Sequence, residues 1–267
     1  MKFTKFVLSF AFTVVMLITI AEAGIVITGT EKALDEYGNH TTIKVYVDAN
    51  RMRVETKDAE TDQVVIFCGD SELFRVIDNT EKTYMEMTKA DLMKIGRKMN
   101  DMMKMLEEKM KNIPPQQREM MAQMMKNQMP SVQESKITYK LIASDEKVHQ
   151  WICKKYEGHR DGIKTEEIWT ANLKDLAISH DDLKVMKMVS KFFESFLNDT
   201  SSFYKIGSED WEKEMGYSGI PVRTITYTNG EMSEIMEISE IQRQNLPASL
   251  FELPEELKKE QGIGRMP

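Results

Sequence analysis

The chain has 267 residues, of which 30% are charged, and a formal net charge of −7 at pH 7. Nucleic-acid phosphates need a basic surface, so this acidity argues against a nucleic-acid partner. Methionine is unevenly distributed, because 13 of the 22 methionines lie between Met85 and Met129. Any functional interpretation has to account for that segment.

The first segment has the composition of a secretory signal peptide. Lys2 and Lys5 precede an apolar run over residues 6–20, and Ala21-Glu22-Ala23 matches a signal-peptidase site. We therefore expect cleavage before Gly24 and export of the remaining chain. The signal peptide carries charges of +2 and −1, so the mature protein should have a net charge of −8.

The mature chain predicts a meander of short antiparallel strands. Apolar and polar residues alternate over short runs separated by turn residues, a pattern typical of an antiparallel sheet rather than of βαβ units. The expected strands cover residues 25–30, 42–47, 52–56, 63–68, 73–77, 82–87, 136–143, 148–156, 164–170, 222–227 and 232–238. Expected turns include 48–50, Gly69-Asp70, Ser144-Asp145, 158–162 and Asn229-Gly230, the last being the strongest hairpin signal.

The methionine-rich segment predicts two amphipathic helices. Thr88 and Asp91 form a capping box, and no proline follows before Pro114. Apolar residues recur at steps of three and four along this first helix, which places them on one face. A second helix should end at Pro130, so we expect a helical hairpin inserted over residues 88–130.

The apolar face of this hairpin consists mainly of unbranched thioether side chains, which repack easily around ligands of variable shape. Residues 88–130 carry nine basic and five acidic residues, a net charge of +4. A basic, methionine-rich hairpin suits a lipid or an anionic membrane surface. The alternatives are that the stripe packs on its own sheet, or that the Met-x-x-Met-Met clusters at 99–103 and 121–125 bind Cu(I).

A further helix and a closing segment are expected in the last third of the chain. Ser179 and Asp182 repeat the capping pattern before an apolar stripe over residues 183–197. This helix should cover the sheet. Residues 247–254 form the closing segment of a single domain over 24–254, and the charged tail over 255–267 should be frayed.

The cysteines and histidines give no sign of a metal site or a catalytic site. Cys68 and Cys153 each lie in an expected strand, and an oxidising compartment permits a disulfide between them. Two buried reduced thiols are the alternative. The four histidines have no metal-ligand spacing and no G-x-S-x-G motif occurs, so we expect no enzyme and no cofactor.

Several short motifs, taken in their order along the chain, indicate a resemblance to a known family. They are residues 46–55 (YVDANRMRVE), 65–70 (VIFCGD), 82–87 (KTYMEM), 113–118 (IPPQQR), 151–156 (WICKKY) and 246–254 (LPASLFELP). Together they resemble an uncharacterised family of exported bacterial proteins, a domain of unknown function whose first half is similar to the periplasmic lipoprotein carrier LolA. The resemblance implies an α+β fold, an unclosed antiparallel β-barrel whose concave apolar face is covered by helices and holds acyl chains, in the periplasm.

These observations predict a monomeric, non-enzymatic periplasmic protein that binds or carries a lipid or an acylated protein between the half-barrel and the helices. The expected lining is Met102, Met103, Leu106, Met110, Met121, Met124 and Met125 from the hairpin, with Met186, Val189, Phe193 and Phe196 from the later helix. The alternative functions are a methionine-rich copper-binding protein and a protein-interaction module that uses the hairpin.

Overall fold

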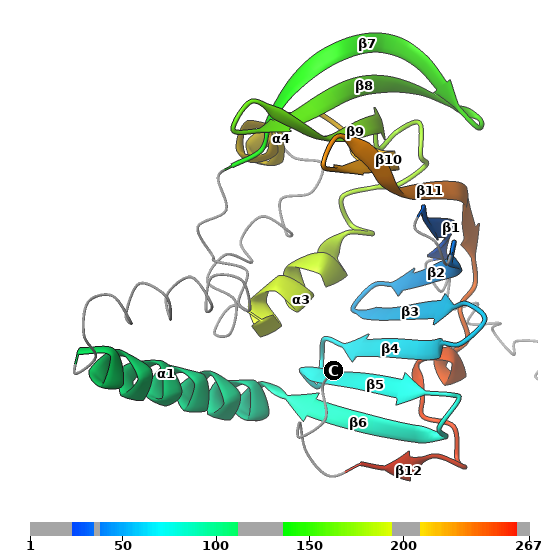
Figure 1. Ribbon diagram of the computed structural model, residues 1–267. Helices are drawn as coiled ribbons and strands as arrows, with labels where there is room; N and C mark the ends of the chain where they lie inside the picture. The colour runs from blue at the N-terminus through cyan, green and yellow to red at the C-terminus, as the bar shows by residue number, and fades with distance from the viewer. Residues whose placement is uncertain (1–22, 35–37, 112–135, 194–208, 261–267) are drawn as a thin grey trace, which may run out of the picture.

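The computed structural model describes residues 23–34, 38–111, 136–193 and 209–260. Within them, twelve strands form one sheet in the order β12-β6-β5-β4-β3-β2-β1-β11-β10-β9-β8-β7. The sheet curls into an open half-barrel, and its two edge strands, β7 and β12, do not pair with each other (Figure 1). The prediction of an unclosed antiparallel half-barrel is therefore confirmed.

The first six strands form the predicted meander. They are β1 (Gly24–Ala33), β2 (His40–Asp48), β3 (Arg51–Lys57), β4 (Asp62–Cys68), β5 (Leu73–Asp78) and β6 (Thr83–Thr88). Each pairs antiparallel with the next through an unbroken register. Short turns join all of these strands except β1 and β2, as antiparallel strands allow.

Of the other strands, β7 to β11 form a second meander, and the short β12 pairs with β6 at the edge of the first. They are β7 (Thr138–Val148), β8 (Trp151–Arg160), β9 (Ile163–Ala171), β10 (Ile220–Thr228), β11 (Glu231–Gln244) and β12 (Lys258–Lys259). Asn229 and Gly230, with φ of 55° and 85°, form the predicted hairpin turn between β10 and β11. β11 then pairs with β1, from Gly24 opposite Gln244 to Ala33 opposite Glu234, and so joins the two meanders.

Two expectations about these strands are wrong. Ser144-Asp145 is not a turn, because β7 runs through it with register shifts between Leu141 and Glu146, and the turn lies at His149. An edge strand accommodates such bulges, since one of its sides has no partner strand. The charged tail is not wholly frayed either, because Lys258 and Lys259 pair parallel with β6.

Both predicted capping boxes are present. The Thr88 and Asp91 side chains bond each other's backbone N–H, at 3.1 and 3.3 Å, before α1 (Lys89–Lys111). Ser179 and Asp182 do the same at 2.7 and 3.4 Å. A turn and α3 (Lys184–Phe193) follow. The expected second helix of the hairpin lies outside the described residues.

The two faces of the sheet carry separate cores. On the concave face, α3 lies inside the curve of the sheet and packs Phe192 edge-on against Phe67, with ring centroids 5.5 Å apart (Figure 1). On the outer face, Ile66 and Ile77 pack with Phe251 from the short 3-10 helix Ala248–Phe251. Apolar side chains on both faces of the sheet are therefore buried.

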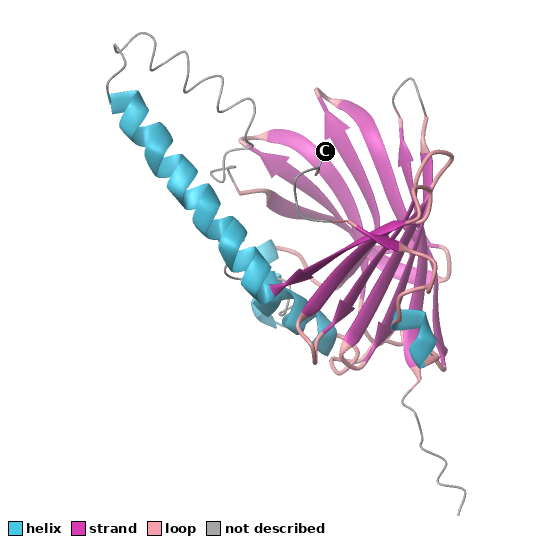
Figure 2. Cartoon of the chain, turned by 90° about the horizontal axis from the view of Figure 1, so that it is seen from below, coloured by secondary structure: helices cyan, strands magenta, loops and turns pink. Residues whose placement is uncertain are grey.

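The remaining helices are placed differently from α3. Among the α1 residues whose side chains are described, Leu92 and Ile95 pack against the concave core, and the helix runs away from the end of β6 (Figure 2). Met93 and Met105 are exposed on it. The helix α4 (Glu209–Met215) was not predicted, and its Trp211 belongs to a small core with Tyr156. Within the described residues, no helix is both long enough and apolar enough to cross a membrane.

Candidate ligand-binding cavity

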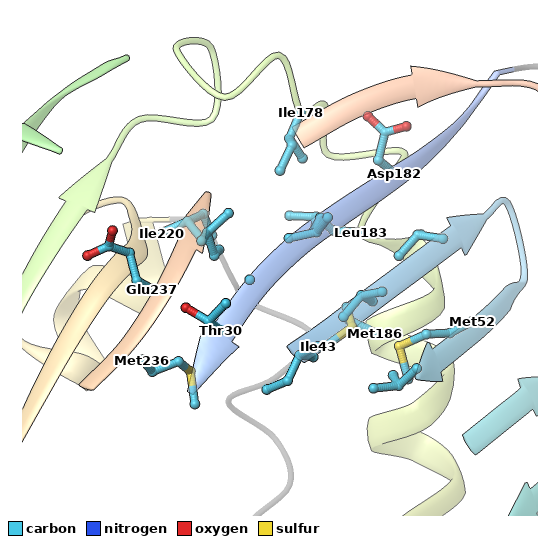
Figure 3. A pocket seen from close by; sticks show the side chains of 16 residues that line it. Thr30, Ile43, Met52, Ile178, Asp182, Leu183, Met186, Ile220, Met236 and Glu237 are labelled. Carbon is cyan, nitrogen blue, oxygen red and sulfur yellow. The ribbon is translucent and has the colours of Figure 1, made fainter. Parts of the chain in front are cut away.

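An apolar cavity of about 420 Å³ lies on the concave face, between the first three strands and the segment that enters α3 (Figure 3). The strands contribute Ile27, Ile43, Val45, Val47, Met52 and Val54. The segment above them contributes Ile178, Leu183 and Met186, and the far side is closed by Ile220, Met236 and Ile238. Its remaining lining residues are Gly29, Thr30, Asp182 and Glu237.

Register on the sheet brings the apolar side chains of the first three strands together. Val45 stands opposite Ile27 on β1 and opposite Val54 on β3, while Val47 stands opposite Met52. Successive side chains alternate between the faces of a strand, so every second residue of β2 between 43 and 47 points to the cavity. β-branched side chains suit this position because they pack well on a pleated surface.

Arg243 holds the segment that roofs the cavity. From β11, its Nε and Nη2 donate to the carbonyl oxygen of Ala177 at 3.1 and 2.9 Å, and its Nη1 donates to Oδ1 of Asp182 at 3.1 Å. Nη2 also bonds Oδ2 of Asp182. These bonds anchor the segment at Ala177 and at the side chain of Asp182, the residues just before Ile178 and Leu183, which both line the cavity.

Charge occurs only at the margin of the cavity. Figure 3 shows the carboxylates of Asp182 and Glu237 on opposite sides of the lining, with the Thr30 hydroxyl and otherwise apolar side chains between them. Glu237 contacts Nε2 of His149 and accepts a hydrogen bond from Nε of Arg223. Burial alone would raise the pKa of Glu237, but these two neighbours outweigh it, and the net pKa is lowered. Glu237 is therefore an anion at neutral pH.

Beyond Glu237 the concave face becomes polar. Trp169 on β9 has the guanidinium of Arg223 5.6 Å and Nζ of Lys155 4.6 Å from its ring centroid. Its Nε1 donates to Glu146 at 3.2 Å, and Lys155 also lies 3.3 Å from the buried Glu167. The concave face thus has an apolar part over β1–β3 and a charged part over β8–β10.

The structure places the predicted lining residues in three different settings. Met186 lines the cavity. Val189 and Phe193 pack against the concave core and are not among the lining residues. Met102, Met103, Leu106 and Met110 lie on α1 with side chains outside the description, and Met121, Met124, Met125 and Phe196 lie outside the described residues altogether.

The sequence interpretation missed the strand residues that form most of the lining. It expected the acyl chain between the half-barrel and the helices, but it named lining residues only on the hairpin and on the later helix. A signal was available, because adjacent strands carry Ile, Val and Met on one face without an aromatic residue among the lining positions. The same pattern is expected of a packed core, so only the structure distinguishes a packed core from the lining of a cavity.

Of the two alternatives for Cys68 and Cys153, the structure has the free thiols and not the disulfide. Cys68 packs with the outer core and Cys153 belongs to the concave core, on strands separated by six others in the sheet. The side chains therefore point to opposite faces. Burial raises the pKa of the Cys153 thiol, as expected for a cysteine that packs as a small hydrophobe.

The copper-binding alternative is not tested by the described residues. They contain no group of three or more His, Cys, Asp and Glu that could hold a metal ion. The methionine cluster at 121–125 lies outside the description, and the side chains of Met99, Met102 and Met103 are not described. Metal capture by thioethers therefore stays a prediction.

Comparison with known proteins identifies a family and gives distant structural likenesses. The model of the family described as "Domain of unknown function (DUF4412)" matches residues 88–257. No protein of curated function matches the chain. An uncharacterised conserved protein from Thermus thermophilus is 9% identical, with a TM-score of 0.45, over 89% of this chain and 90% of that one. The LolA superfamily protein NE2245 from Nitrosomonas europaea is 10% identical, with a TM-score of 0.29, over 88% and 91%.

Proposed function

This chain belongs to the DUF4412 family of unknown function, and we propose that it binds the acyl chain of a lipid or of an acylated protein in the cavity between β1–β3 and α3. The observation that carries the proposal is the combination of volume and lining. At about 420 Å³, the cavity lies within the range of ligand pockets, roughly 300–1,000 Å³. Its charged groups are confined to the margin.

The lining selects for an apolar ligand. The acids at the margin, Asp182 and Glu237, are already bonded to Arg243 and Arg223, and the hydroxyl of Thr30 is the only other polar side-chain group among the lining residues. A polar ligand would lose its bonds to water without replacement. Each methylene buried there should contribute about 0.8 kcal/mol, so affinity can come from chain length alone.

The same proposal includes export to the periplasm and approach to an anionic membrane. The amino-terminal segment supports export through its lysines, apolar run and Ala-x-Ala site. Lys94, Arg97, Lys98 and Lys104 are exposed on α1, the helix that runs away from the sheet, and can contact anionic headgroups. Membrane contact would bring the cavity close to a source of acyl chains.

A matched pair of variants tests the proposal. Met186→Asp places a charge in the cavity, whereas Met188→Asp places the same charge on an exposed position of the same helix. We expect displacement of a fluorescent fatty-acid probe to show binding by the wild type and by Met188→Asp but not by Met186→Asp. Circular dichroism and urea unfolding check that both variants fold.

The experiment also separates the cavity from the hairpin as the acyl site. If Met103→Asp abolishes probe binding while folded Met186→Asp does not, the methionine-rich hairpin is the site and the cavity is not. A chain-length series provides an independent readout. Each two-carbon extension should tighten binding by about tenfold until the cavity is full, and an affinity independent of length would contradict burial of the chain.

A further inference from the structure

The size of the cavity limits how many acyl chains it holds. An apolar protein cavity of about 150 Å³ accommodates a benzene ring, so at the same packing a volume of about 420 Å³ accommodates roughly 16 carbon atoms. That is one chain of ordinary length. A diacyl lipid brings two such chains and exceeds the space available.

Arg223 stands at one end of this cavity with most of its hydrogen-bonding capacity unused. Its Nε donates to Glu237, which lines the cavity. Its two Nη groups make no hydrogen bond within the described part of the chain, and its side chain is 32% exposed. By contrast, Arg243 at the other end uses all three nitrogens on the roof segment. The Nη pair of a guanidinium matches the oxygen spacing of a carboxylate or a phosphate.

The charged groups around Arg223 leave room for one more anion. Glu237 is shared between Arg223 and His149. The nearby Lys155 lies over the Trp169 ring and pairs with Glu167, while Glu146 accepts from Nε1 of Trp169. Glu237, Glu167 and Glu146 each have a partner in this group. The Nη atoms of Arg223 form no hydrogen bond within the described residues, and they belong to the side chain bonded to Glu237, a residue that lines the cavity.

We propose that the ligand is a single-chain amphiphile with an anionic head, a carboxylate or a phosphate monoester, and that Arg223 binds this head at the Glu237 end of the cavity. The inference rests on the proposed function, because it assumes that the cavity holds the chain. A cationic head would be repelled by Arg223, and a neutral head would gain no charge-assisted hydrogen bond. Arg223 would thus select among ligands that share the same chain.

Ligands with one chain length and different heads test this selection on the mature protein. Palmitic acid, hexadecyl phosphate, hexadecanol and hexadecyltrimethylammonium are titrated below their aggregation limits, with a diacyl phosphatidic acid as the two-chain comparison. We expect the two anions to bind roughly ten- to hundredfold more tightly than hexadecanol. The ratio between palmitic acid and hexadecyl phosphate then identifies which head chemistry is preferred.

Two variants at the Arg223 pair should act in opposite directions. Arg223→Met should bring the ratio of palmitic acid to hexadecanol affinity close to one. Glu237→Gln should raise that ratio several-fold, because it removes a competing carboxylate. If either substitution merely disturbed the fold, that variant would bind both palmitic acid and hexadecanol more weakly. Arg75→Met, which removes an arginine whose Nε pairs with Glu86 on distant strands, should leave every affinity unchanged.

The outcomes separate this inference from the function on which it depends. Equal binding of palmitic acid and hexadecanol would overturn the assignment of an anionic head while leaving the acyl site intact. Tight binding of the diacyl lipid would overturn the single-chain limit. Failure of every C16 compound to bind would overturn the proposed function itself, and weaker anion binding by Glu237→Gln would show that Arg223 does not act as proposed.

Discussion

Arg243→Met should release the roof of the cavity without unfolding the sheet. The substitution keeps an aliphatic stem and removes the guanidinium that joins β11 to Ala177 and Asp182. The Arg243 side chain is 40% exposed and that of Asp182 14%, so the ion pair should contribute roughly 1 kcal/mol, the upper end for exposed pairs. The bonds to the Ala177 carbonyl add about 1 kcal/mol more. A loss of about 2 kcal/mol raises the open fraction of the segment roughly 30-fold.

Hydrogen exchange measures this opening at individual amides. The N–H of Ala177 bonds the Lys174 carbonyl at 3.1 Å and that of Ile178 bonds the Leu173 carbonyl at 3.0 Å, so both amides report on the roof segment. We expect their exchange to accelerate by about 30-fold in Arg243→Met, with amides of β4 unchanged. Arg75→Met is the control. Unchanged exchange at these two amides, or equal acceleration throughout the sheet, would refute the role given to Arg243.

Three further predictions concern pH, the thiols and the concave core. Burial raises the pKa of Asp182 and the bonds from Arg243 and Ser179 lower it, with a net lowering. The stability contributed by the Arg243–Asp182 pair is therefore complete above the unfolded pKa, about 4. The protection factors of the roof amides, which are corrected for the pH dependence of intrinsic exchange, should decrease only below that pH. In the native protein, a thiol reagent should modify the half-buried Cys68 before the buried Cys153. If neither cysteine reacts, even after unfolding, a disulfide between them is indicated instead. Phe192→Ala should lower the free energy of unfolding, measured with urea, by about 3–5 kcal/mol, because Phe192 is 1% exposed. Met188→Ala should lower it by under about 1 kcal/mol. Equal losses in the two variants would contradict the packing of α3 on the sheet.

Local signals in the sequence were reliable where the bonding partners are close in the chain. The capping boxes at Thr88 and Ser179 are present because each links residues three positions apart. The Asn229-Gly230 hairpin formed because both residues tolerate positive φ. Ser144-Asp145 misled because the same turn-forming residues also fit a bulge, and only the edge position of β7 decides between them.

The candidate site was less predictable because composition does not show which apolar face is left unfilled. Methionine enrichment directed attention to residues 88–130, and of the three expected lining residues whose side chains are described, only Met186 borders the cavity. The cavity instead forms where Val45 and its neighbours on β1–β3 face a segment more than a hundred residues later in the chain. A strand face of Ile and Val has the same sequence pattern whether a helix packs against all of it or leaves a cavity above part of it.

The sequence by itself determined the strand alternation, the helix starts, the hairpin turns and the family likeness, since these depend on side chains a few positions apart. The tertiary structure decided which strands meet, through the pairing of Gly24 with Gln244 that joins the two meanders. It also decided that Cys68 and Cys153 lie on opposite faces, and that Arg243 reaches back to Ala177 and roofs the cavity. The physical reason is that such contacts depend on the curvature and register of the whole sheet, and no short window of sequence contains both partners.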